Sequence, residues 1–403
     1  MTDAILTLNA GSSSVKFAVF EAREARLAEV LARGRIERVG SRPRLVVRDA
    51  ANAVLHDRTW PEGERPRFDE LIDAALAWCE TRLGGRSPAA LGHRVVHGGP
   101  NRREPAIVTP ELLRELEALR PLAPLHEPHN LDPIHAISAS RPELRQVACF
   151  DTAFHHTMPA TATRLAIPRA YEAKGVRRYG FHGLSYEYLA GALRTIDPVL
   201  AEGRVIAAHL GSGASLCALR AGLSVETTMG FTALDGLVMG TRCGTLDPGV
   251  VLYLLQQEGL SAQEVQELLY KRSGLLGVSG GLSSDMRDLL ESPHPGAREA
   301  VETFVYRFVR EAGALVSCLG GLDGLVFTAG VGENAPAIRR MTCAGLAWLG
   351  VEIDYAANKE GRDLISTPGS KVKVRIIPTD EERMIARHTL ALLAAPGDVG
   401  QSD

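Results

Sequence analysis

Residues 4–20 are the segment that most constrains what this chain can fold into. An apolar run of β-type residues ends at Asn9, a short turn rich in glycine and serine follows, and a second β-type run containing Lys16 leaves the turn. This order predicts an antiparallel hairpin. A glycine that lets the backbone come close, hydroxyl donors, unpaired N–H groups and one lysine together suit an oligophosphate. An ordinary hairpin of small residues would explain the pattern equally well.

The same pattern returns half a chain later, in residues 204–219. An apolar run again meets a Gly/Ser turn and leaves as a β-type run. In this alignment Leu8 corresponds to Leu210 and Gly11 to Gly213. One such hairpin is a weak signal, but two of them suggest a duplicated domain with a phosphate-binding turn in each copy.

A third glycine-rich turn, residues 328–334, follows the apolar run 325–327 and precedes a helical pattern with Pro336 near its start. Proline is favoured at the first position of a helix. Two phosphate hairpins and a late strand–glycine–helix element resemble the large superfamily that contains actin, the heat-shock chaperone ATPases and the sugar kinases.

The composition sets broad limits on the class of protein. A chain of 403 residues is long enough for two domains, and its hydrophobic fraction of 45% is that of an ordinary globular protein. The formal net charge of −3 gives no field that would attract nucleic acid or a membrane surface. The six cysteines are scattered without a C-x-x-C pair, and no signal segment or membrane span is recognisable. We therefore expect a cytoplasmic protein that binds neither nucleic acid nor a membrane.

Alternating β-type runs and helical patterns predict an α/β architecture. Residues 121–133, rich in proline and histidine, are expected to form a loop. The strand 146–150 is expected to end at Asp151, at the edge where α/β proteins place their chemistry. Helices are predicted at 68–83, 110–119, 261–271, 297–318 and 381–394.

Ten motifs resemble those of the acetate kinase (acetokinase) family, which belongs to this superfamily. They are LNAGSSSVKF, GHRVVHGG, APLHEPHN, FDTAFHHTMP, RRYGFHG, HLGSGAS, GLVMGTR, SSDMR, TAGVGEN and PTDEE. The resemblance implies reversible transfer of the γ-phosphoryl group from ATP to acetate, giving acetyl phosphate and ADP. It also implies a homodimer and a requirement for Mg²⁺, for which Mn²⁺ would substitute.

The resemblance further implies two duplicated ribonuclease H-like (actin-like ATPase) α/β domains with a central interdomain cleft. Residues 1–150 would form the first domain, which the C-terminal helix 382–396 would complete. Residues 151–381 would form the second domain.

A carboxylate acceptor is already a nucleophile at neutral pH, so such an enzyme must mainly bring two anions together and hold the γ-phosphoryl group in line. That task needs cations and fixed donors. Arg94 suits the substrate carboxylate and Arg242 the oxygens of the transferring group, because a guanidinium binds both in a forked geometry. The resemblance assigns Arg242 and His182 as transition-state stabilisers. Taken singly, each arginine would equally fit an ordinary ion pair.

Asp151 is expected to be catalytic, with its role open. In sugar kinases the corresponding aspartate abstracts a proton, which a carboxylate acceptor does not require. Asp151 would instead orient Arg94, or position the acid or the water shell of the metal. The resemblance supplies Asn9 and Glu381 as ligands of magnesium, which takes few protein ligands and keeps several waters. Spacing alone favours Glu381 as an acid that stabilises the first turn of a helix.

The residues expected to bind nucleotide lie in the two hairpins and two later turns: Ser12, Lys16, His209, Leu210, Gly211, Ser212, Gly213, Asp285, Met286, Arg287, Gly330, Val331, Gly332, Glu333 and Asn334. Those expected to bind the acyl substrate are Arg94, Val96, Leu125, His126 and Phe181. Ser283–Asp285 would equally serve as a helix cap.

The chain departs from the family pattern near these residues. Ser212 replaces an asparagine, Ala233 a proline, Leu184 a threonine and Tyr186 a histidine. A hydroxyl at 212 reaches less far toward a phosphate, and the change at 233 would widen the acyl pocket enough for propionate.

Three other functions remain open at this point. A propionate or butyrate kinase of the same family would differ in its acyl pocket. A nucleotide-switch protein would keep the hairpins but lack the set of Arg94, His182 and Arg242. A sugar or polyol kinase would need a polar pocket instead of an apolar one.

Overall fold

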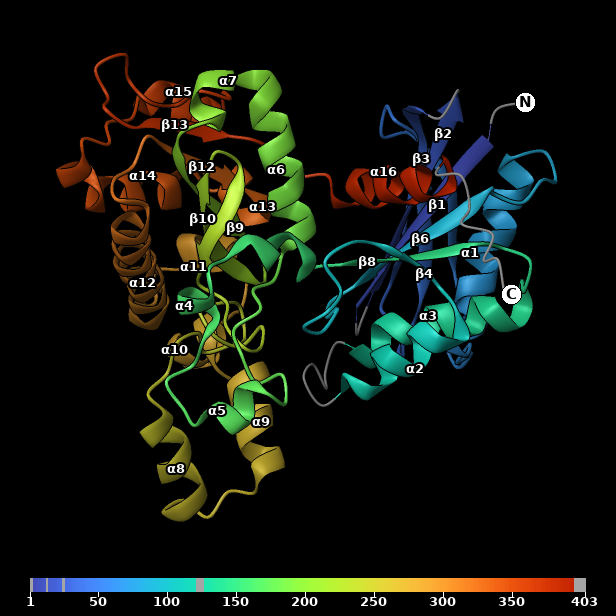
Figure 1. Cartoon of the computed structure of the whole chain (residues 1–403), viewed down its shortest axis with the longest axis horizontal. Helices are drawn as coiled ribbons and strands as arrows, with labels where there is room; N and C mark the ends of the chain where they lie inside the picture. Colours follow the sequence, from blue (N-terminus) through green and yellow to red (C-terminus); the bar gives the residue numbers. More distant parts are fainter. Residues whose placement is uncertain (1–2, 12–13, 24–25, 121–126, 395–403) are drawn as a thin grey trace, which may run out of the picture. The chain divides into compact units, whose positions relative to one another are not determined.

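The computed structural model describes residues 3–11, 14–23, 26–120 and 127–394, and shows an α/β protein with two β-sheets (Figure 1). The chain divides into two compact units. Unit 1 comprises residues 1–153 and 380–403, and unit 2 comprises residues 154–379. Within the described part of the chain, no helix has the length and apolar character needed to cross a membrane.

β1 is an inner strand of the eight-stranded sheet of unit 1, whose order is β5–β4–β3–β2–β1–β6–β8–β7. It pairs antiparallel with β2 and parallel with β6, and β6 pairs parallel with β8. The predicted N-terminal hairpin is therefore confirmed. The strands are β1 (Asp3–Ala10), β2 (Ser14–Arg23), β3 (Arg26–Glu37), β4 (Arg44–Arg48), β5 (Val54–Thr59), β6 (Ala90–Val95), β7 (Ala106–Ile107) and β8 (Gln146–Phe150).

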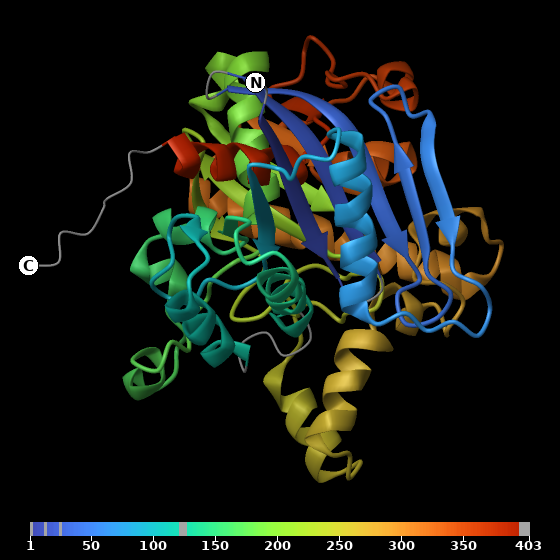
Figure 2. The ribbon, with the colours of Figure 1, turned by 90° about the vertical axis from the view of Figure 1, so that its right-hand side faces the viewer.

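The two faces of this sheet are covered by different helices, namely α1 (Phe68–Arg82) and α3 (Glu127–Ser140) on one face and α16 (Glu381–Ala394) on the other, with α2 (Pro110–Ala118) beside α3. Side chains alternate between the faces of a strand. Leu6 and Leu8 join the cluster that includes residues of α1 and α3, whereas Ile5 joins the cluster that includes Ala386 of α16. Figure 2 shows α1 lying along its face of the sheet.

Unit 2 contains a five-stranded sheet of order β11–β10–β9–β12–β13. β9 pairs antiparallel with β10 and parallel with β12, and β12 pairs parallel with β13. β9 thus has the neighbours in unit 2 that β1 has in unit 1, which is the pattern expected of a duplication. The strands are β9 (Arg204–Leu210), β10 (Ala214–Arg220), β11 (Leu223–Thr227), β12 (Gly324–Thr328) and β13 (Lys373–Ile376).

The hydrogen bonds that close the two hairpins correct the alignment made from sequence. Gly11 N donates to Ser14 O at 2.9 Å, directly after β1. Gly211 N donates to Gly213 O at 2.9 Å, directly after β9. Gly11 therefore corresponds to Gly211 rather than to Gly213, and the second turn is shorter than the first.

Helices cover both faces of the second sheet. α6 packs on one face, where Leu189 and Leu193 join Val205 and Val326 in one buried cluster. α12 packs on the other face and contacts β9, β10 and β11. α8 and α9 extend together away from the sheet (Figures 1 and 2). The helices named from here on are α6 (Gly183–Ile196), α7 (Pro198–Ala201), α8 (Pro248–Gln256), α9 (Ala262–Lys271), α11 (Met286–Glu291), α12 (Pro295–Leu319), α13 (Ala329–Asn334), α14 (Pro336–Gly345) and α15 (Tyr355–Glu360).

Two predictions of loops were wrong. Residues 127–133 of the expected loop 121–133 belong to α3, because Leu131 and Ile134 are buried against β6 and β8, and this packing outweighs the helix-breaking effect of Pro133. The rest of that loop, 121–126, lies outside the described residues. The glycine turn 328–334 is mostly the short helix α13.

Other local predictions are confirmed. Ser261 and Glu264 form the expected capping box at the start of α9. Pro336 occupies the start of α14, as predicted.

The contact of α16 with β6 can be tested at Gly92. A Cβ atom there would lie 2.2 Å from Thr389 Oγ1 and 2.5 Å from Ile385 Cγ2, both on α16. Because both neighbours are β-branched and stiff, we expect Gly92→Ala to destabilise the protein by ~1–3 kcal/mol in thermal unfolding.

The matched control is Gly191→Ala, in the interior of α6, where an added Cβ meets nothing within 4 Å. It should stabilise by up to ~1 kcal/mol because alanine favours the helix. An unchanged unfolding midpoint for Gly92→Ala would contradict this packing.

Candidate active site

The carboxyl ends of three parallel strands bring polar residues together in unit 1. Asn9 lies near the end of β1, Arg94 near the end of β6, and Asp151 directly after β8. Arg94 Nη1 donates to Asn9 Oδ1 at 3.4 Å, and Arg94 Nη2 donates to Asp151 Oδ2. The structure therefore places these three predicted site residues at one edge of the sheet, where ligands of α/β proteins bind.

The Arg94–Asp151 pair is largely buried, with 19% of the Arg94 side chain exposed and 1% of the Asp151 side chain. Burial alone would lower the pKa of Arg94, but the charges of Asp151 and Glu381 outweigh it and raise that pKa. The guanidinium is thus held charged. Its Nε–H has no hydrogen-bond partner among the described residues.

Glu381 and Lys16 lie beside the same cluster. Asn9 Nδ2 donates to Glu381 Oε2 at 3.2 Å, and Lys16 is directly opposite Asn9 in the β1–β2 pair, so both project from the same face. Burial and the charge of Glu381 raise the pKa of the neighbouring Glu382, whereas Lys16 lowers it. The carboxylates of Glu381 and Glu382 and the ammonium group of Lys16 therefore lie close together beside Asn9.

Asn9 and Glu381 have the right chemistry for a magnesium ion that keeps most of its water. Amide and carboxylate oxygens are hard donors, as magnesium prefers. Across the described residues, no three His, Cys, Asp or Glu side chains are grouped to hold a metal by themselves.

In unit 2 the turn between β9 and β10 has two side-chain donors directed at it. A Cβ atom built on Gly213 would lie 3.0 Å from Arg242 Nη2 and 3.2 Å from His182 Nε2. Both predicted transition-state stabilisers therefore reach the same point above the turn. Arg242 Nη1 also donates to Ala233 O at 2.7 Å, which fixes the guanidinium from its other side.

His182 is held in an uncommon backbone conformation. It is the N-terminal cap residue of α6, with φ of 59° and ψ of 25°. A non-glycine residue in this left-handed region costs of order 1–3 kcal/mol unless its surroundings impose it, and such residues gather at functional sites.

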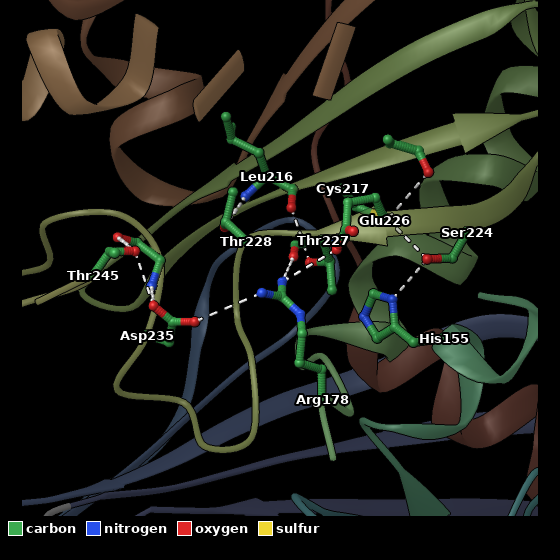
Figure 3. Close-up of polar contacts among 12 residues, drawn as sticks. His155, Arg178, Leu216, Cys217, Ser224, Glu226, Thr227, Thr228, Asp235 and Thr245 are labelled. Atoms are coloured by element: carbon green, nitrogen blue, oxygen red, sulfur yellow. Dashed lines mark hydrogen bonds and ion pairs between the residues drawn. The ribbon is translucent and has the colours of Figure 1, made fainter. Parts of the chain in front are cut away.

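His155 helps to impose this conformation on the segment that carries His182. Burial lowers the pKa of His155 to about 4, so its imidazole is neutral. His155 Nε2 lies 2.9 Å from Phe181 O. Its Nδ1 lies 2.9 Å from Ser224 Oγ (Figure 3). The carbonyl requires a donor, so Nε2 carries the proton and Nδ1 accepts from the hydroxyl. Phe181 itself is buried in unit 2.

Arg178 fastens the loop that leads to Arg242. Its guanidinium donates to Thr227 O at 2.5 Å and to Glu226 Oε1 at 3.1 Å, and it lies 4.0 Å from Asp235 Oδ2 (Figure 3). Asp235 in turn accepts from Gly236 N and from the Thr245 hydroxyl, each at 2.9 Å. These contacts hold both sides of the loop that carries Ala233 and Arg242.

A cavity of about 500 Å³ opens beside this turn, within the size range of small-ligand sites. Most of the predicted nucleotide residues of unit 2 line it, namely Gly211, Ser212, Asp285, Met286, Arg287, Gly330, Val331 and Asn334. Asp285 is also the N-terminal cap of α11, since its carboxylate accepts from Arg287 N at 2.8 Å. The helix-cap role and a place in the cavity wall therefore coexist.

A buried arginine fixes one wall of the cavity. Arg339 is 1% exposed and donates to Gly332 O and Glu333 O, each at 2.8 Å. Its other bonds reach Asn358 on α15. Glu333 points inward, since its Oε1 accepts from Ala329 N at 2.8 Å and from Thr379 N at 3.3 Å. Glu333 thus caps its own short helix.

The remaining predicted residues have simpler positions. Val96 is buried in unit 1, where its N–H donates to Asn130 Oδ1 at 2.8 Å. His209 stacks on His182 with ring centroids 4.1 Å apart. Leu210 and Gly332 are buried. Ser12, Leu125 and His126 lie outside the described residues.

The sequence analysis missed several residues that position the site: His155, Arg178, Ser215 and Arg339. His155, Arg178 and Ser215 lie in quoted motifs, but no spacing rule shows which group a side chain will reach. Arg339 reads as an ordinary surface residue of a helix until its burial is known.

Comparisons with known proteins agree with this geometry. The model of a family described as the acetokinase family matches residues 4–387. An acetate kinase of Rhodopseudomonas palustris strain TIE-1 is 52% identical over 396 residues, which cover 97% of this chain and 99% of that protein. One of Methylocella silvestris is 50% identical over 98% of each chain.

Solved structures of similar sequence have the same fold. A propionate kinase from Francisella tularensis superposes with a TM-score of 0.88 at 35% identity, covering 96% of this chain and 98% of that one. An acetate kinase from Porphyromonas gingivalis gives 0.85 at 38% identity, covering 97% and 100%.

The Arg178 network predicts a pH-dependent loss of stability. Burial raises the pKa of Glu226, whereas the charge of Arg178 lowers it. A carboxyl group whose folded pKa is raised is tolerated when protonated and destabilises the fold as the pH rises through that pKa. Arg178→Gln removes the compensating charge, so its thermal midpoint should fall further below the wild type at pH 7.5 than at pH 5.

Adding Glu226→Gln to this variant supplies the control. The double variant should lose the extra pH dependence, because residue 226 then has no carboxyl group to ionise. An equal deficit at both pH values would show that the Arg178–Glu226 charge pairing contributes nothing to stability.

Proposed function

The chain belongs to the acetokinase family, and on this premise we propose that it is an acetate kinase, which transfers the γ-phosphoryl group of ATP to acetate and forms acetyl phosphate and ADP reversibly. One observation supports the proposal most strongly. Arg242 Nη2 and His182 Nε2 reach the same point over the Gly213 turn, beside the cavity lined by predicted nucleotide-binding residues. A nucleotide-switch protein has no need of such a convergence.

In this proposal unit 2 binds the nucleotide and stabilises the transferring group. Charge on a transferring phosphoryl group is spread over its equatorial oxygens, and fixed donors directed at those oxygens lower the barrier. Arg242 and His182 are those donors. The turn of residues 211–213 lies beside the phosphates in this proposal, and Ser212 supplies a hydroxyl in place of an amide.

Unit 1 supplies the groups for the carboxylate. Arg94 is kept charged, and its Nε–H is a donor without a hydrogen-bond partner among the described residues. Asp151 accepts from Nη2 of the same guanidinium, so its role here is to orient Arg94 rather than to abstract a proton. A carboxylate oxygen attacks phosphorus without prior deprotonation, which leaves no task for a general base.

Asn9 and Glu381 would hold a magnesium ion with water and the nucleotide phosphates. Such an ion neutralises phosphate charge and so reduces the repulsion that an anionic acceptor meets. Lys16, directly opposite Asn9, adds a further positive charge at this edge.

The residues around Arg242 bear on whether the enzyme prefers acetate or the longer propionate. The propionate kinase with a TM-score of 0.88 keeps propionate as the second candidate. Ala233, whose carbonyl holds Arg242, stands where the family pattern has a bulkier proline. One methylene is worth only ~1–3 kcal/mol in such a pocket, so we expect graded selectivity rather than strict exclusion.

We further propose that the protein is a homodimer and cytoplasmic. None of the residues of α8 is buried, although the helix reads PGVVLYLLQ, and Leu252 and Tyr253 are each 53% exposed. An unburied apolar helix of this kind is typical of an interaction surface.

All six cysteines are free thiols, as suits a reducing compartment.

The proposed activity can be tested by assaying the protein with acetate, propionate and butyrate. Purified protein with Mg-ATP and hydroxylamine should give acyl hydroxamate with acetate, less with propionate and least with butyrate, measured as kcat/KM. Arg94→Ala should raise the KM for acetate, because the carboxylate loses its charged donor. Absence of hydroxamate from every short acid would overturn the proposal.

Gly213→Ala tests the convergence itself. The new methyl group would occupy the point that Arg242 and His182 share, so we expect kcat to fall on the order of 100-fold with the KM for ATP little changed. The matched control is Gly313→Ala, since an added Cβ on that helix meets nothing within 4 Å. A Gly213→Ala enzyme of normal kcat would show that the two donors do not act there.

The dimer is tested at α8. The double variant Leu252→Glu and Tyr253→Glu should be monomeric in analytical ultracentrifugation, because it places charge on the exposed apolar helix. Val199→Glu is the control, at an 83% exposed position on α7. Equal sedimentation of both variants as dimers would place the interface elsewhere.

A further inference from the structure

Three side chains form a buried chain of hydrogen bonds behind the phosphate turn. Tyr186 lies one helical turn after His182 on α6, and Ser215 lies on β10 next to the turn. Tyr186 Oη is 2.5 Å from Ser215 Oγ, which is 2.8 Å from His182 Nδ1. Tyr186 and Ser215 are 0% exposed, so water cannot substitute for either bond.

The proton on each bond follows from counting donors and acceptors. Burial, with a further contribution from Cys217, raises the pKa of Tyr186 well above its usual value, so the phenol keeps its hydrogen. The backbone of His209 also hydrogen-bonds the Tyr186 oxygen and lowers its pKa, as an N–H donor does. The phenol therefore directs its own hydrogen to Ser215 Oγ. The serine must then direct its own hydrogen to its other partner, His182 Nδ1.

We infer that Tyr186 and Ser215 are positioning residues that hold His182 as the neutral tautomer with its hydrogen on Nε2. The functional part of this inference rests on the proposed kinase activity. Nε2 is the atom that lies 3.2 Å from the Gly213 Cβ position, beside Arg242 Nη2. We call the hydrogen-bond chain Tyr186–Ser215–His182 the relay. It directs an N–H donor at the place where phosphoryl oxygens would bind.

The other neutral tautomer would be unproductive. It would place a hydrogen on Nδ1 and direct the Nε2 lone pair at anionic oxygens, which repels them. An imidazolium would keep the donor, but its Nδ1–H would meet the hydrogen of the Ser215 hydroxyl while Tyr186 occupies the serine oxygen. The phenol thus opposes both alternatives.

The titratable and charged groups around His182 do not replace this relay. His209 stacks on the imidazole, but its Nδ1 is bonded to Ser185 Oγ at 2.8 Å. Arg242 reaches the turn on the Nε2 side. On the far side of Tyr186 lie the neutral His155 ring, 5.8 Å between centroids, and the Cys217 thiol, whose pKa burial raises to about 12.

The tautomer can be read without any activity. The full chain labelled with ¹⁵N-histidine, free of ligand, should show a His182 spectrum of the Nε2–H form at pH 8. His182→Gln assigns the signal. In Tyr186→Phe the serine hydroxyl no longer receives a hydrogen bond, so the Nδ1–H form should appear. A wild-type His182 with its hydrogen on Nδ1 would overturn the inference.

Kinetics supply the second readout. At pH 8 Tyr186→Phe should have a kcat reduced about tenfold, a partial loss of one transition-state donor, with the KM for ATP unchanged. As the pH falls toward 6 its kcat should recover toward that of the wild type, because the imidazolium regains an Nε2–H donor. A merely structural defect would not recover with acid.

Controls separate the possible failures. Tyr188→Phe, on the same helix, should keep the wild-type kcat and pH profile. Should Tyr186→Phe fold poorly, Ser215→Ala tests the same relay and should also populate Nδ1–H. A wild type without hydroxamate activity would refute the proposed function and leave the tautomer to be judged by the spectrum. A Tyr186→Phe enzyme whose kcat and pH profile match the wild type would refute the role of the relay.

Discussion

Each sheet depends on an inner strand that pairs with an antiparallel hairpin partner on one side and with parallel strands on the other. Such a strand ends in a tight turn on its hairpin side, as β1 and β9 do. On its parallel side, neighbouring strands end at the same edge and present their last side chains together. One backbone arrangement therefore produces both a phosphate turn and a row of polar residues.

The two units use this arrangement for different charges. In unit 1 the row is Asn9, Arg94 and Asp151, and the arginine remains charged although largely buried, because Asp151 and Glu381 offset its desolvation. In unit 2 the donors come from outside the strands, from the cap of α6 and from an irregular loop. That loop needs its own fastening, which Arg178 supplies through a backbone carbonyl and two carboxylates.

Much of this could be predicted from the sequence. The hairpins, the capping box at Ser261 and the place of Asp151 after β8 follow from local chemistry and were correct. The alignment of the second hairpin with the first was wrong by two residues, because small residues on both sides of the turn allow more than one alignment. The start of α3 was missed because the burial of Leu131 outweighs the local effect of proline.

The supporting residues were beyond sequence reasoning for a different reason. Whether Tyr186 changes the site depends on which oxygen its hydroxyl meets, and Ser215 is 29 residues away on another element. The same holds for Arg339, whose partners on α13 and α15 are set by packing. Local patterns predict what an element is, whereas long-range contacts decide which groups it supports.

The central claim is that Arg242 and His182, the donors at the Gly213 turn, stabilise the phosphoryl group during its transfer. They contribute less to the binding of the nucleotide itself. Calorimetric titration with ADP, magnesium and acetate, in the presence and absence of aluminium fluoride as a mimic of that group, measures this directly. The account predicts that fluoride tightens ADP binding to the wild type and not to Gly213→Ala, while both bind ADP alone equally. Equal tightening in both proteins would contradict it.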